Sequence, residues 1–361
     1  MNIIYVMHVD WNWIKQRPQY IAEFLGKNNT VSIVYDKNYK SHRLSSNDPP
    51  ENCSLRAFYR IPGEFKNRFI RLLNSFHRKA LLRNLIRSSN TDVLWLSFPT
   101  MVDSIPDNYR GIVVYDCMDD HFAMASARAK SVILECENRL LKRADLVLFS
   151  SKRLETIVTE RIAVSKPYII RNGYIGSDFI DAEGPEIRKE DGAFHLCYFG
   201  TVSSWFDWDT VLHAIHSLEG LYVHILGPVN FLPDTVNHER LIFHGPVKHN
   251  ELKSYVQDMD CFIMPFIIND IILSVDPVKL YEYIAFNKNI IVSYYPEIDR
   301  FKEFVYFYES KEDFLNRIRT LMDNNNLKYD IDASNRFLAE STWDARCKDI
   351  ERILVSCRGN K

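Results

Sequence analysis

Lys279 and Glu282 stand three residues apart in the segment SVDPVKLYEYIA, residues 274–285. Asp276 is a good N-cap and Pro277 a good first helical residue, so the segment predicts a helix that begins there. On one helical face, Lys279 would add a cation to the phosphate-binding helix start, and Glu282 could accept hydrogen bonds from a ribose diol. The spacing therefore indicates a nucleotide site, and a surface ion pair without a ligand is the alternative.

Two apolar runs before this segment end in glycine, where a backbone can approach a ligand closely. After Gly200, Thr201 and Ser203 can donate hydrogen bonds to phosphate. Backbone exposed after Gly245 could pair with a base edge, although a plain turn explains it equally well. Neither run has the G-x-G-x-x-G spacing of a dinucleotide site. The predicted donor-binding residues are Gly200, Thr201, Ser203, Gly245, Val247, Ser274, Asp276, Val278, Lys279, Leu280 and Glu282.

Another group of polar residues follows an apolar run in the first half of the chain. The segment VVYDCMDDHF brings together Asp116, Asp119, Asp120 and His121. Carboxylates and an imidazole there suit contacts to a hydroxylated substrate, or one general base. Capping of the next helix by an aspartate is the alternative. Together with Lys279, the predicted catalytic residues are Asp119, Asp120 and His121.

A loop after the first apolar run is rich in aromatic residues. Trp11 and Trp13 could stack on sugar faces, or they could pack beneath the loop. The predicted acceptor-binding residues are His8, Trp11, Trp13, Arg17 and Asn172. Because no second cluster with matching ligand spacing occurs, no metal site is predicted.

Parallel strands would position all of these residues. Short apolar runs alternate with helical patterns in two series, from NIIYVMH to PYIIRNG and from FHLCYFG to NIIVSYY. Runs of this kind predict strands buried on both faces, hence two doubly wound α/β domains whose sheets bind ligand where the strands end. A polar linker at 181–193 separates them. The predicted domains are 1–180 and 194–338, followed by a C-terminal helix in 339–361.

Composition agrees with two globular domains. The chain has 361 residues, of which 46% are hydrophobic and 25% charged. Seven cysteines without a C-x-x-C pair favour a reducing compartment. No apolar run reaches the length of a signal peptide or membrane span. The expected location is cytoplasmic, either soluble or peripheral at the inner face of the cytoplasmic membrane.

Residues 56–87 form a basic segment with nine Lys or Arg and a single acid, Glu64. Its charge of +8 leaves −10 for the rest of the chain, given the net charge of −2. One helical face would carry Phe65, Phe69, Leu72, Leu73, Phe76 and Ala80. Such a helix suits an anionic membrane surface, and a core helix with a solvated basic face is the alternative. Nucleic acid is less favoured, because the aromatic residues form a stripe and not a set of stacking platforms.

Six segments, in their order along the chain, resemble segments of bacterial glycosyltransferases of the GT-B fold, nearest to the retaining family 4. They cover nearly the whole chain and read QRPQYIAEFL, ADLVLFSSKRL, IIRNGY, CYFGTVSSWFDWDTVLHAI, LIFHGPVKHNELKSYVQDMDCFIMPF and VDPVKLYEYIAFNKNIIVS. The resemblance implies two Rossmann-like domains facing each other across a cleft. It implies that the C-terminal domain binds the donor, with Glu282 on the ribose and the loop near Gly200 on the pyrophosphate. The DDHF region would face acceptor and transferred sugar, and the C-terminal helix would cross back to the first domain.

Two positions depart from this family's pattern. Ser274 stands where the family usually has a second Glu, and the basic pair expected after the glycine loop is absent from GTVSSWFDWD, where Lys279 would replace it. The expected activity is transfer of a sugar from a nucleotide diphosphate donor to a polysaccharide or lipid-linked acceptor, with retention and without metal or cofactor. The alternatives are an epimerase, an inverting transferase with His121 or His8 as base, or a non-catalytic nucleotide-sugar-binding subunit.

Overall fold

The structure is a computed structural model that describes residues 1–13, 15–37, 49–164, 166–176, 192–248 and 251–359. The chain forms two compact units. Unit 1 comprises Met1–Asn172 and Trp343–Lys361, and unit 2 comprises Gly173–Thr342. Most of the expected linker at 181–193 lies outside the described residues.

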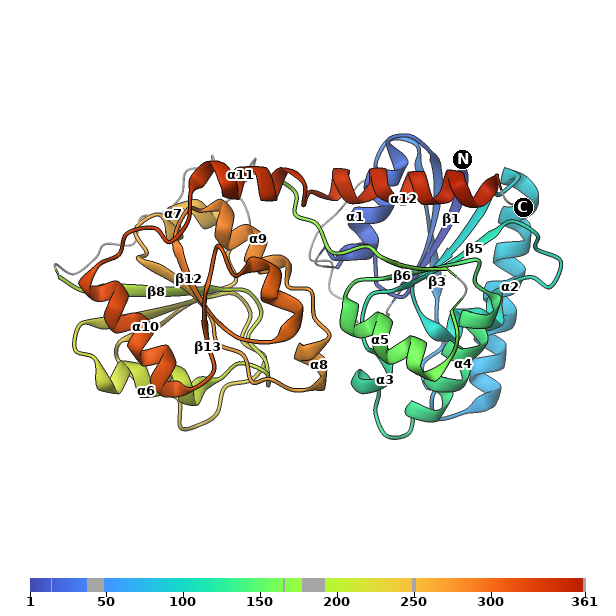
Figure 1. The fold of residues 1–361 in the computed structure, drawn as a ribbon. Helices are drawn as coiled ribbons and strands as arrows, with labels where there is room; N and C mark the ends of the chain where they lie inside the picture. Colours follow the sequence, from blue (N-terminus) through green and yellow to red (C-terminus); the bar gives the residue numbers. More distant parts are fainter. Residues whose placement is uncertain (14, 38–48, 165, 177–191, 249–250, 360–361) are drawn as a thin grey trace. The chain divides into compact units, whose positions relative to one another are not determined.

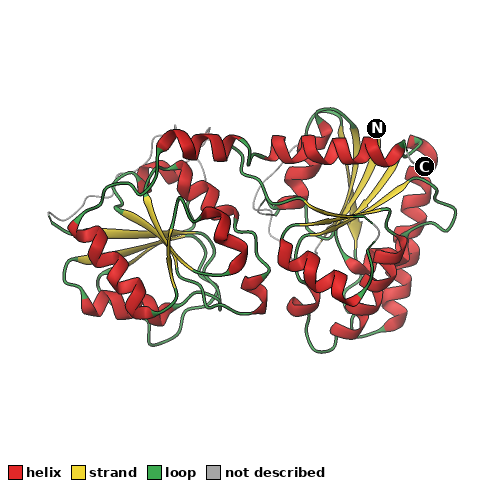
Figure 2. Cartoon of the chain, in the orientation of Figure 1, coloured by secondary structure: helices red, strands yellow, loops and turns green. Residues whose placement is uncertain are grey.

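Unit 1 contains a parallel sheet of seven strands among its described residues, in the order β3-β2-β1-β4-β5-β6-β7 (Figures 1 and 2). The strands are β1 (Asn2–Met7), β2 (Thr30–Lys37), β3 (Cys53–Tyr59), β4 (Val93–Leu96), β5 (Ile112–Cys117), β6 (Leu146–Phe149) and β7 (Pro167–Ile169). The helices are α1 (Arg17–Gly26), α2 (Arg68–Ser89), the 3-10 helix η1 (Pro99–Ser104), α3 (His121–Met124), α4 (Lys130–Arg143), α5 (Lys152–Arg161) and α12 (Trp343–Arg358).

Unit 2 repeats this plan with six parallel strands in its described part, in the order β10-β9-β8-β11-β12-β13. They are β8 (Phe194–Phe199), β9 (Leu221–Leu226), β10 (Leu241–Gly245), β11 (Cys261–Met264), β12 (Asn289–Ser293) and β13 (Tyr306–Tyr308). The helices are α6 (Trp208–Ser217), α7 (Leu252–Val256), α8 (Asp270–Leu273), α9 (Val278–Ala285), the 3-10 helix η4 (Pro296–Phe301), α10 (Lys311–Asp323) and α11 (Ile331–Ala339).

The strands are continuous apolar runs because helices cover both faces of each sheet. In unit 1, α1 and α12 close one face, where Trp343 stacks on Tyr20 with ring centroids 5.3 Å apart. Side chains of α2, η1 and α4, among them Leu82, Met101 and Leu140, pack on the other face. The prediction of two doubly wound, Rossmann-like domains is confirmed.

Chain order reverses once within each sheet. In unit 1 the reversal lies between neighbouring strands β1 and β4, and in unit 2 between β8 and β11. Open α/β sheets bind ligands at such a switch point, at the edge where the parallel strands end. This edge, called the carboxyl edge below, is therefore where each unit's candidate site belongs.

Helix α2 lies where the basic segment predicts a helix, and it has features of both interpretations. Phe69, Leu72 and Phe76 are exposed, whereas Arg78 is buried. Leu82 of the same helix packs in the core of unit 1 and Arg68, Arg83 and Arg87 are exposed, as the core-helix alternative expects, so contact of this helix with a membrane stays a prediction. Within the described ranges, no helix is both long and apolar enough to cross a bilayer.

Candidate functional site

Glycines build the carboxyl edge of unit 2 at its switch point. Gly200, directly after β8, has φ +149° and donates its N–H to the carbonyl of Leu226 at 2.8 Å. A Cβ on Gly227, after β9, would lie 2.2 Å from the Gly200 carbonyl oxygen, so a side chain there would force the loops apart. Gly245 belongs to the same cluster, because its carbonyl accepts from the N–H of Gly227 at 2.7 Å. The glycines predicted from sequence thus lie together, and close packing requires glycine at Gly227.

Helix α9 begins at Val278, with Pro277 as N-cap and no capping side chain. The expectation that Asp276 caps the helix is wrong. Its carboxylate is buried in an ion pair with Arg300, which also donates to the hydroxyl of Tyr281 at 2.7 Å. The reason is electrostatic, since a buried carboxylate needs a cation beside it.

Lys279 and Glu282 do lie on one face of α9, and their side chains form an ion pair at 2.9 Å. Lys279 Nζ is 5.2 Å from the centre of the Phe199 ring, and its Cε is 3.4 Å from the position of a Cβ on Gly200. The Glu282 side chain is nearly buried, at 9% exposed. The ion pair that the alternative expects is therefore present. It lies against the glycine loop at the switch point, unlike a pair on an open helix surface.

Several other predicted donor residues have their groups occupied within unit 2. The buried Ser274 donates its hydroxyl to the carbonyl of Asp270 at 3.3 Å, on the last turn of α8. Leu280 packs in the core and donates its N–H to the carbonyl of Pro277 at 3.2 Å. These contacts support the α8–α9 connection, and donor contacts of Ser274, Asp276 and Leu280 stay predictions.

The remaining predicted donor residues lie on loops that follow strands. The Thr201 carbonyl accepts the Tyr198 hydroxyl at 2.9 Å, and the Ser203 carbonyl accepts the N–H of Phe206 at 3.0 Å. Val247 is half-buried against the core of unit 2. Donor contacts of these residues remain predictions.

Two histidines meet at the carboxyl edge of unit 1. His8 follows β1 and lies 2.9 Å from the hydroxyl of Ser97, which follows β4. The rings of His8 and His121 meet edge to face, 5.6 Å apart. Burial, reinforced by Arg60, lowers the pKa of His8 to about 4. Burial and the neighbouring His8 lower the pKa of His121 to about 3, so both rings are neutral at physiological pH.

The three aspartates at and after the end of β5 have three different roles. Asp120 caps α3 by accepting the N–H of Ala123 at 2.9 Å, which confirms the capping alternative for one aspartate. Asp116 is fully buried and is held by Arg17. Burial raises the pKa of Asp119 to about 6, against the attraction of Arg17. Asp119 therefore titrates near neutral pH, as a general base does.

The predicted acceptor residues separate into buried and exposed members. Arg17 is buried and donates to Asp116 at 2.9 Å and to the carbonyl of Ile170 at 2.7 Å. Asn172 accepts from Arg17 at 3.3 Å, and Trp11 packs in the core of unit 1. The structure thus gives Arg17 and Trp11 buried structural positions, and their contact with an acceptor stays a prediction. Trp13 is exposed, and its contact with an acceptor stays a prediction.

Three residues beside the predicted site residues have no obvious sequence signal. Ser97 and Phe98 follow β4, and the Phe98 ring lies 4.8 Å from that of His121. The run DVLWLSF predicts a strand end, but only the strand order places it beside β1. Arg300, which holds Asp276, lies in η4 and becomes a neighbour of α9 only through folding. Within the described ranges, no three His, Cys, Asp or Glu side chains gather as metal ligands would.

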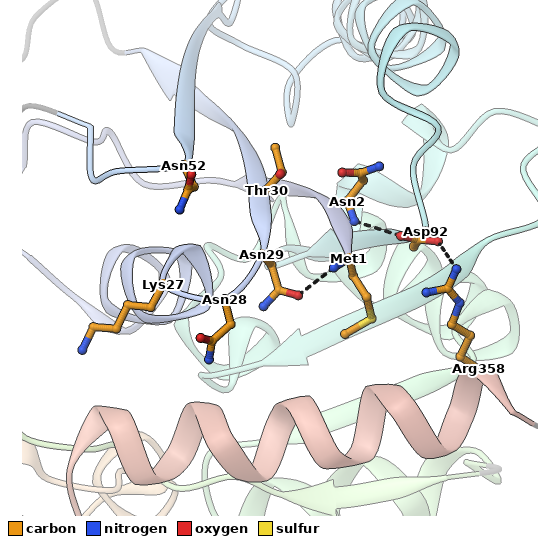
Figure 3. Close-up of a pocket in the computed structure, with 9 residues that line it drawn as sticks. All are labelled: Met1, Asn2, Lys27, Asn28, Asn29, Thr30, Asn52, Asp92 and Arg358. Carbon is orange, nitrogen blue, oxygen red and sulfur yellow. Dashed lines mark hydrogen bonds and ion pairs between the residues drawn. The ribbon is translucent and has the colours of Figure 1, made fainter.

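A cavity of about 480 Å³ lies at the opposite edge of unit 1's sheet, where its strands begin (Figure 3). Its polar groups contact one another. The amino terminus donates to Asn29 at 3.0 Å, and Asp92 accepts from the N–H of Asn2 and pairs with Arg358. None of the predicted site residues lines this cavity.

Comparisons with known proteins agree with this architecture. No family model matches the chain. TuaH of Bacillus subtilis (strain 168), whose name assigns it provisionally to teichuronic acid biosynthesis as a glycosyltransferase, is 25% identical over 236 residues. That match covers 60% of this chain and 59% of the length of TuaH.

Solved structures of similar fold cover the chain more completely. Sucrose-phosphate synthase from Thermosynechococcus elongatus superposes with a TM-score of 0.73 at 12% identity, over 100% of both chains. Anabaena HepE, in complex with UDP and glucose, has a TM-score of 0.67 at 10% identity, over 98% of this chain and 99% of its own. With the two parallel sheets, these matches establish the GT-B fold.

Proposed function

We propose that this protein transfers a sugar from a nucleotide diphosphate donor to a hydroxyl group of a surface polysaccharide or lipid-linked glycan. The observation that carries the proposal is the Lys279–Glu282 pair, held against the Gly200 loop at the switch point of unit 2. A diphosphate is bound by a cation and by backbone N–H groups that can approach it closely. A ribose is bound by a carboxylate, here one helical turn further along α9. The similarity to TuaH, and the UDP and glucose bound to HepE, support the same reaction class.

In this proposal Lys279 assists departure of the nucleotide. Negative charge grows on the leaving phosphate as the glycosidic bond breaks, so a cation beside it stabilises the transition state more than the ground state. Backbone N–H groups of the glycine loop and of the first turn of α9 would share this charge. The donor is a co-substrate, and the proposal requires neither a metal nor a cofactor.

We further propose a retaining outcome, with the leaving phosphate acting as base. The low pKa values of His8, about 4, and His121, about 3, support this view, because both imidazoles are weak bases. They suit hydrogen bonds to sugar hydroxyls better than proton abstraction. Asp119, with its pKa of about 6, is the base that an inverting mechanism would use, and its substitution separates the two mechanisms.

The proposed place of action is the inner face of the cytoplasmic membrane, where a lipid-linked acceptor would be found. The exposed apolar stripe of α2 and the exposed cations beside it support this location. Turnover of a nucleotide sugar panel, read as release of nucleotide diphosphate with and without glycan acceptor, tests the reaction. If no donor is consumed, the proposed reaction is excluded and a non-catalytic nucleotide-sugar-binding subunit is favoured.

Replacing Glu282 with alanine is expected to weaken UDP binding about 10- to 100-fold. The variant removes charge-assisted hydrogen bonds to the ribose, each worth about 1.5–3 kcal/mol. Titration calorimetry with UDP measures the loss. Glu282→Gln, which keeps one acceptor oxygen, should retain part of the affinity, and Glu340→Ala, elsewhere in unit 2, should have no effect. Undiminished affinity in Glu282→Ala would refute the ribose assignment.

Replacing Asp119 with asparagine is expected to leave kcat within about threefold if the leaving phosphate is the base. An inverting enzyme would lose about 100- to 10,000-fold, and its rate would rise with pH through about 6 as Asp119 ionises. The anomeric configuration of the product provides the independent answer.

Comparing the stability of Asp119→Asn with that of the wild type also tests whether the pKa of Asp119 is raised in the folded protein. The folded-state pKa of about 6 exceeds the ordinary value of 3.8, so Asp119 contributes most to stability below about pH 4. This contribution is lost as pH rises through about 6. Relative to Asp119→Asn, the wild type should therefore become less stable across this window in denaturant titrations.

A further inference from the structure

Helix α2 turns an apolar stripe away from unit 1. Phe69, Leu72 and Phe76 are spaced by three and four residues and are 71%, 53% and 66% exposed. Side chains at this spacing lie above one another on one face of a helix. Large apolar side chains are rarely left together at a surface that contacts only water.

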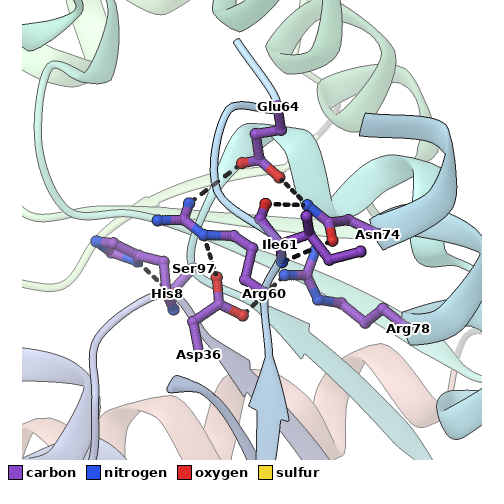
Figure 4. A network of polar contacts seen from close by, with 8 residues as sticks. All are labelled: His8, Asp36, Arg60, Ile61, Glu64, Asn74, Arg78 and Ser97. Carbon is purple, nitrogen blue, oxygen red and sulfur yellow. Dashed lines mark hydrogen bonds and ion pairs between the residues drawn. The ribbon is translucent and has the colours of Figure 1, made fainter. Parts of the chain in front are cut away.

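The opposite face of α2 explains this orientation (Figure 4). Arg78 is buried in an ion pair with Asp36, at the end of β2, at 2.7 Å. Asn74 accepts the N–H of Ile61 at 3.0 Å, donates to its carbonyl at 2.9 Å and reaches Glu64 at 3.1 Å. Turning the stripe inward would break this network and leave buried charge without partners. The buried polar contacts therefore hold the apolar stripe outward.

Cations flank the stripe. Lys66, Arg68, Arg83 and Arg87 are exposed. The basic segment's single acid, Glu64, is buried between Arg60 and Asn74. Asp107, which lies outside the segment, pairs with Lys79 at 2.8 Å and approaches Arg83 at 3.7 Å. The face around the stripe is thus strongly positive, and the segment contributes no exposed carboxylate to it.

We propose that this face of α2 docks on an anionic lipid bilayer, with Phe69, Leu72 and Phe76 entering the headgroup boundary and the flanking cations contacting lipid phosphates. A helix with an apolar stripe bordered by Lys and Arg lies in the interface plane of a membrane. A second copy of the chain fits the face poorly, because a twofold contact would bring the same cations together. The inference deepens the proposed location at the membrane and requires no donor chemistry.

Flotation of the full chain with lipid vesicles, without nucleotide sugar, tests the proposal. Binding is expected to vesicles of phosphatidylcholine with phosphatidylglycerol, to weaken with added salt, and to be much weaker with phosphatidylcholine alone. Arg83→Gln with Arg87→Gln should lower the partition coefficient about 25-fold, because each cation near such a surface is worth about 1 kcal/mol, or about fivefold. Phe69→Ser with Leu72→Ser and Phe76→Ser should lower it at least about tenfold.

Matched controls come from other exposed positions of the chain. Lys348→Gln with Arg352→Gln removes two exposed cations from α12, and Val355→Ser with Ile331→Ser removes two exposed apolar side chains. Both should bind vesicles as the wild type does. The melting temperature of each variant verifies that it is folded, and nucleotide-sugar turnover without vesicles separates failed docking from a failed reaction.

Three outcomes would overturn the proposal. They are indifference to lipid charge, absence of vesicle binding, and equal losses in the α2 and control variants. A dimer in sedimentation that the serine substitutions on α2 dissociate would show that a second copy covers the stripe instead.

Discussion

Replacing Lys279 with alanine is expected to lower kcat about 100- to 1,000-fold while changing donor KM by less than about fivefold. That loss corresponds to about 3–4 kcal/mol of transition-state stabilisation, the size found when one preorganised donor to a developing anion is removed. The ammonium lies beside Gly200 and is held by Glu282 at 2.9 Å, so little reorganisation is needed when charge develops. Initial rates with labelled donor give kcat and KM separately.

Three control variants sharpen this experiment. Lys279→Arg keeps the charge and should recover part of the rate, whereas Lys279→Met keeps the aliphatic stem alone and should match alanine. Lys311→Ala, an exposed lysine on α10 paired with Asp209, should leave kcat unchanged. A rise in KM alone would mean that Lys279 binds the ground state and transition state equally.

Replacing Arg17 with alanine is expected to destabilise unit 1 by about 3–5 kcal/mol, because Asp116 would be left as a buried charge without its cation. The guanidinium joins α1 to the end of β5 and also donates to the carbonyl of Ile170 after β7. Tyr5 remains as a donor to Asp116 at 3.3 Å, since burial raises the pKa of its hydroxyl. Hydrogen exchange resolved by peptide should increase in α1, β5 and β7 but not in unit 2.

The chain offers a matched control for this variant. Lys15 and Glu23 form an ion pair in the same region with side chains 34% and 31% exposed. Lys15→Ala should cost less than about 1 kcal/mol, because solvent screens that pair. The double variant Arg17→Met with Asp116→Leu should regain much of the stability lost in Arg17→Ala, as both charges are then absent. Equal effects of Lys15→Ala and Arg17→Ala would contradict the role of the buried pair.

The fold class was predictable because its signals are local. Apolar runs such as VLWL and CFIM, alternating with helical patterns, predict strands buried on both faces, and these became β4 and β11. The pair Lys279 and Glu282 was equally predictable, since three residues along a helix always share a face. The glycine at the end of β8 likewise followed from the sequence, and the fold placed Lys279 beside it.

Contacts between distant parts of the chain were decided only by tertiary structure. Asp276 was predicted to cap a helix, but its carboxylate pairs with Arg300. Arg17 was predicted to bind the acceptor, and its guanidinium is buried against Asp116. The spacing of apolar residues in α2 predicted an apolar face but did not show whether that face points toward the core or toward solvent. The buried pair of Arg78 with Asp36 turned it outward. Periodicity and capping preferences act over a few residues, whereas the partner of a buried charge depends on which strand ends lie beside it, and chain topology sets that.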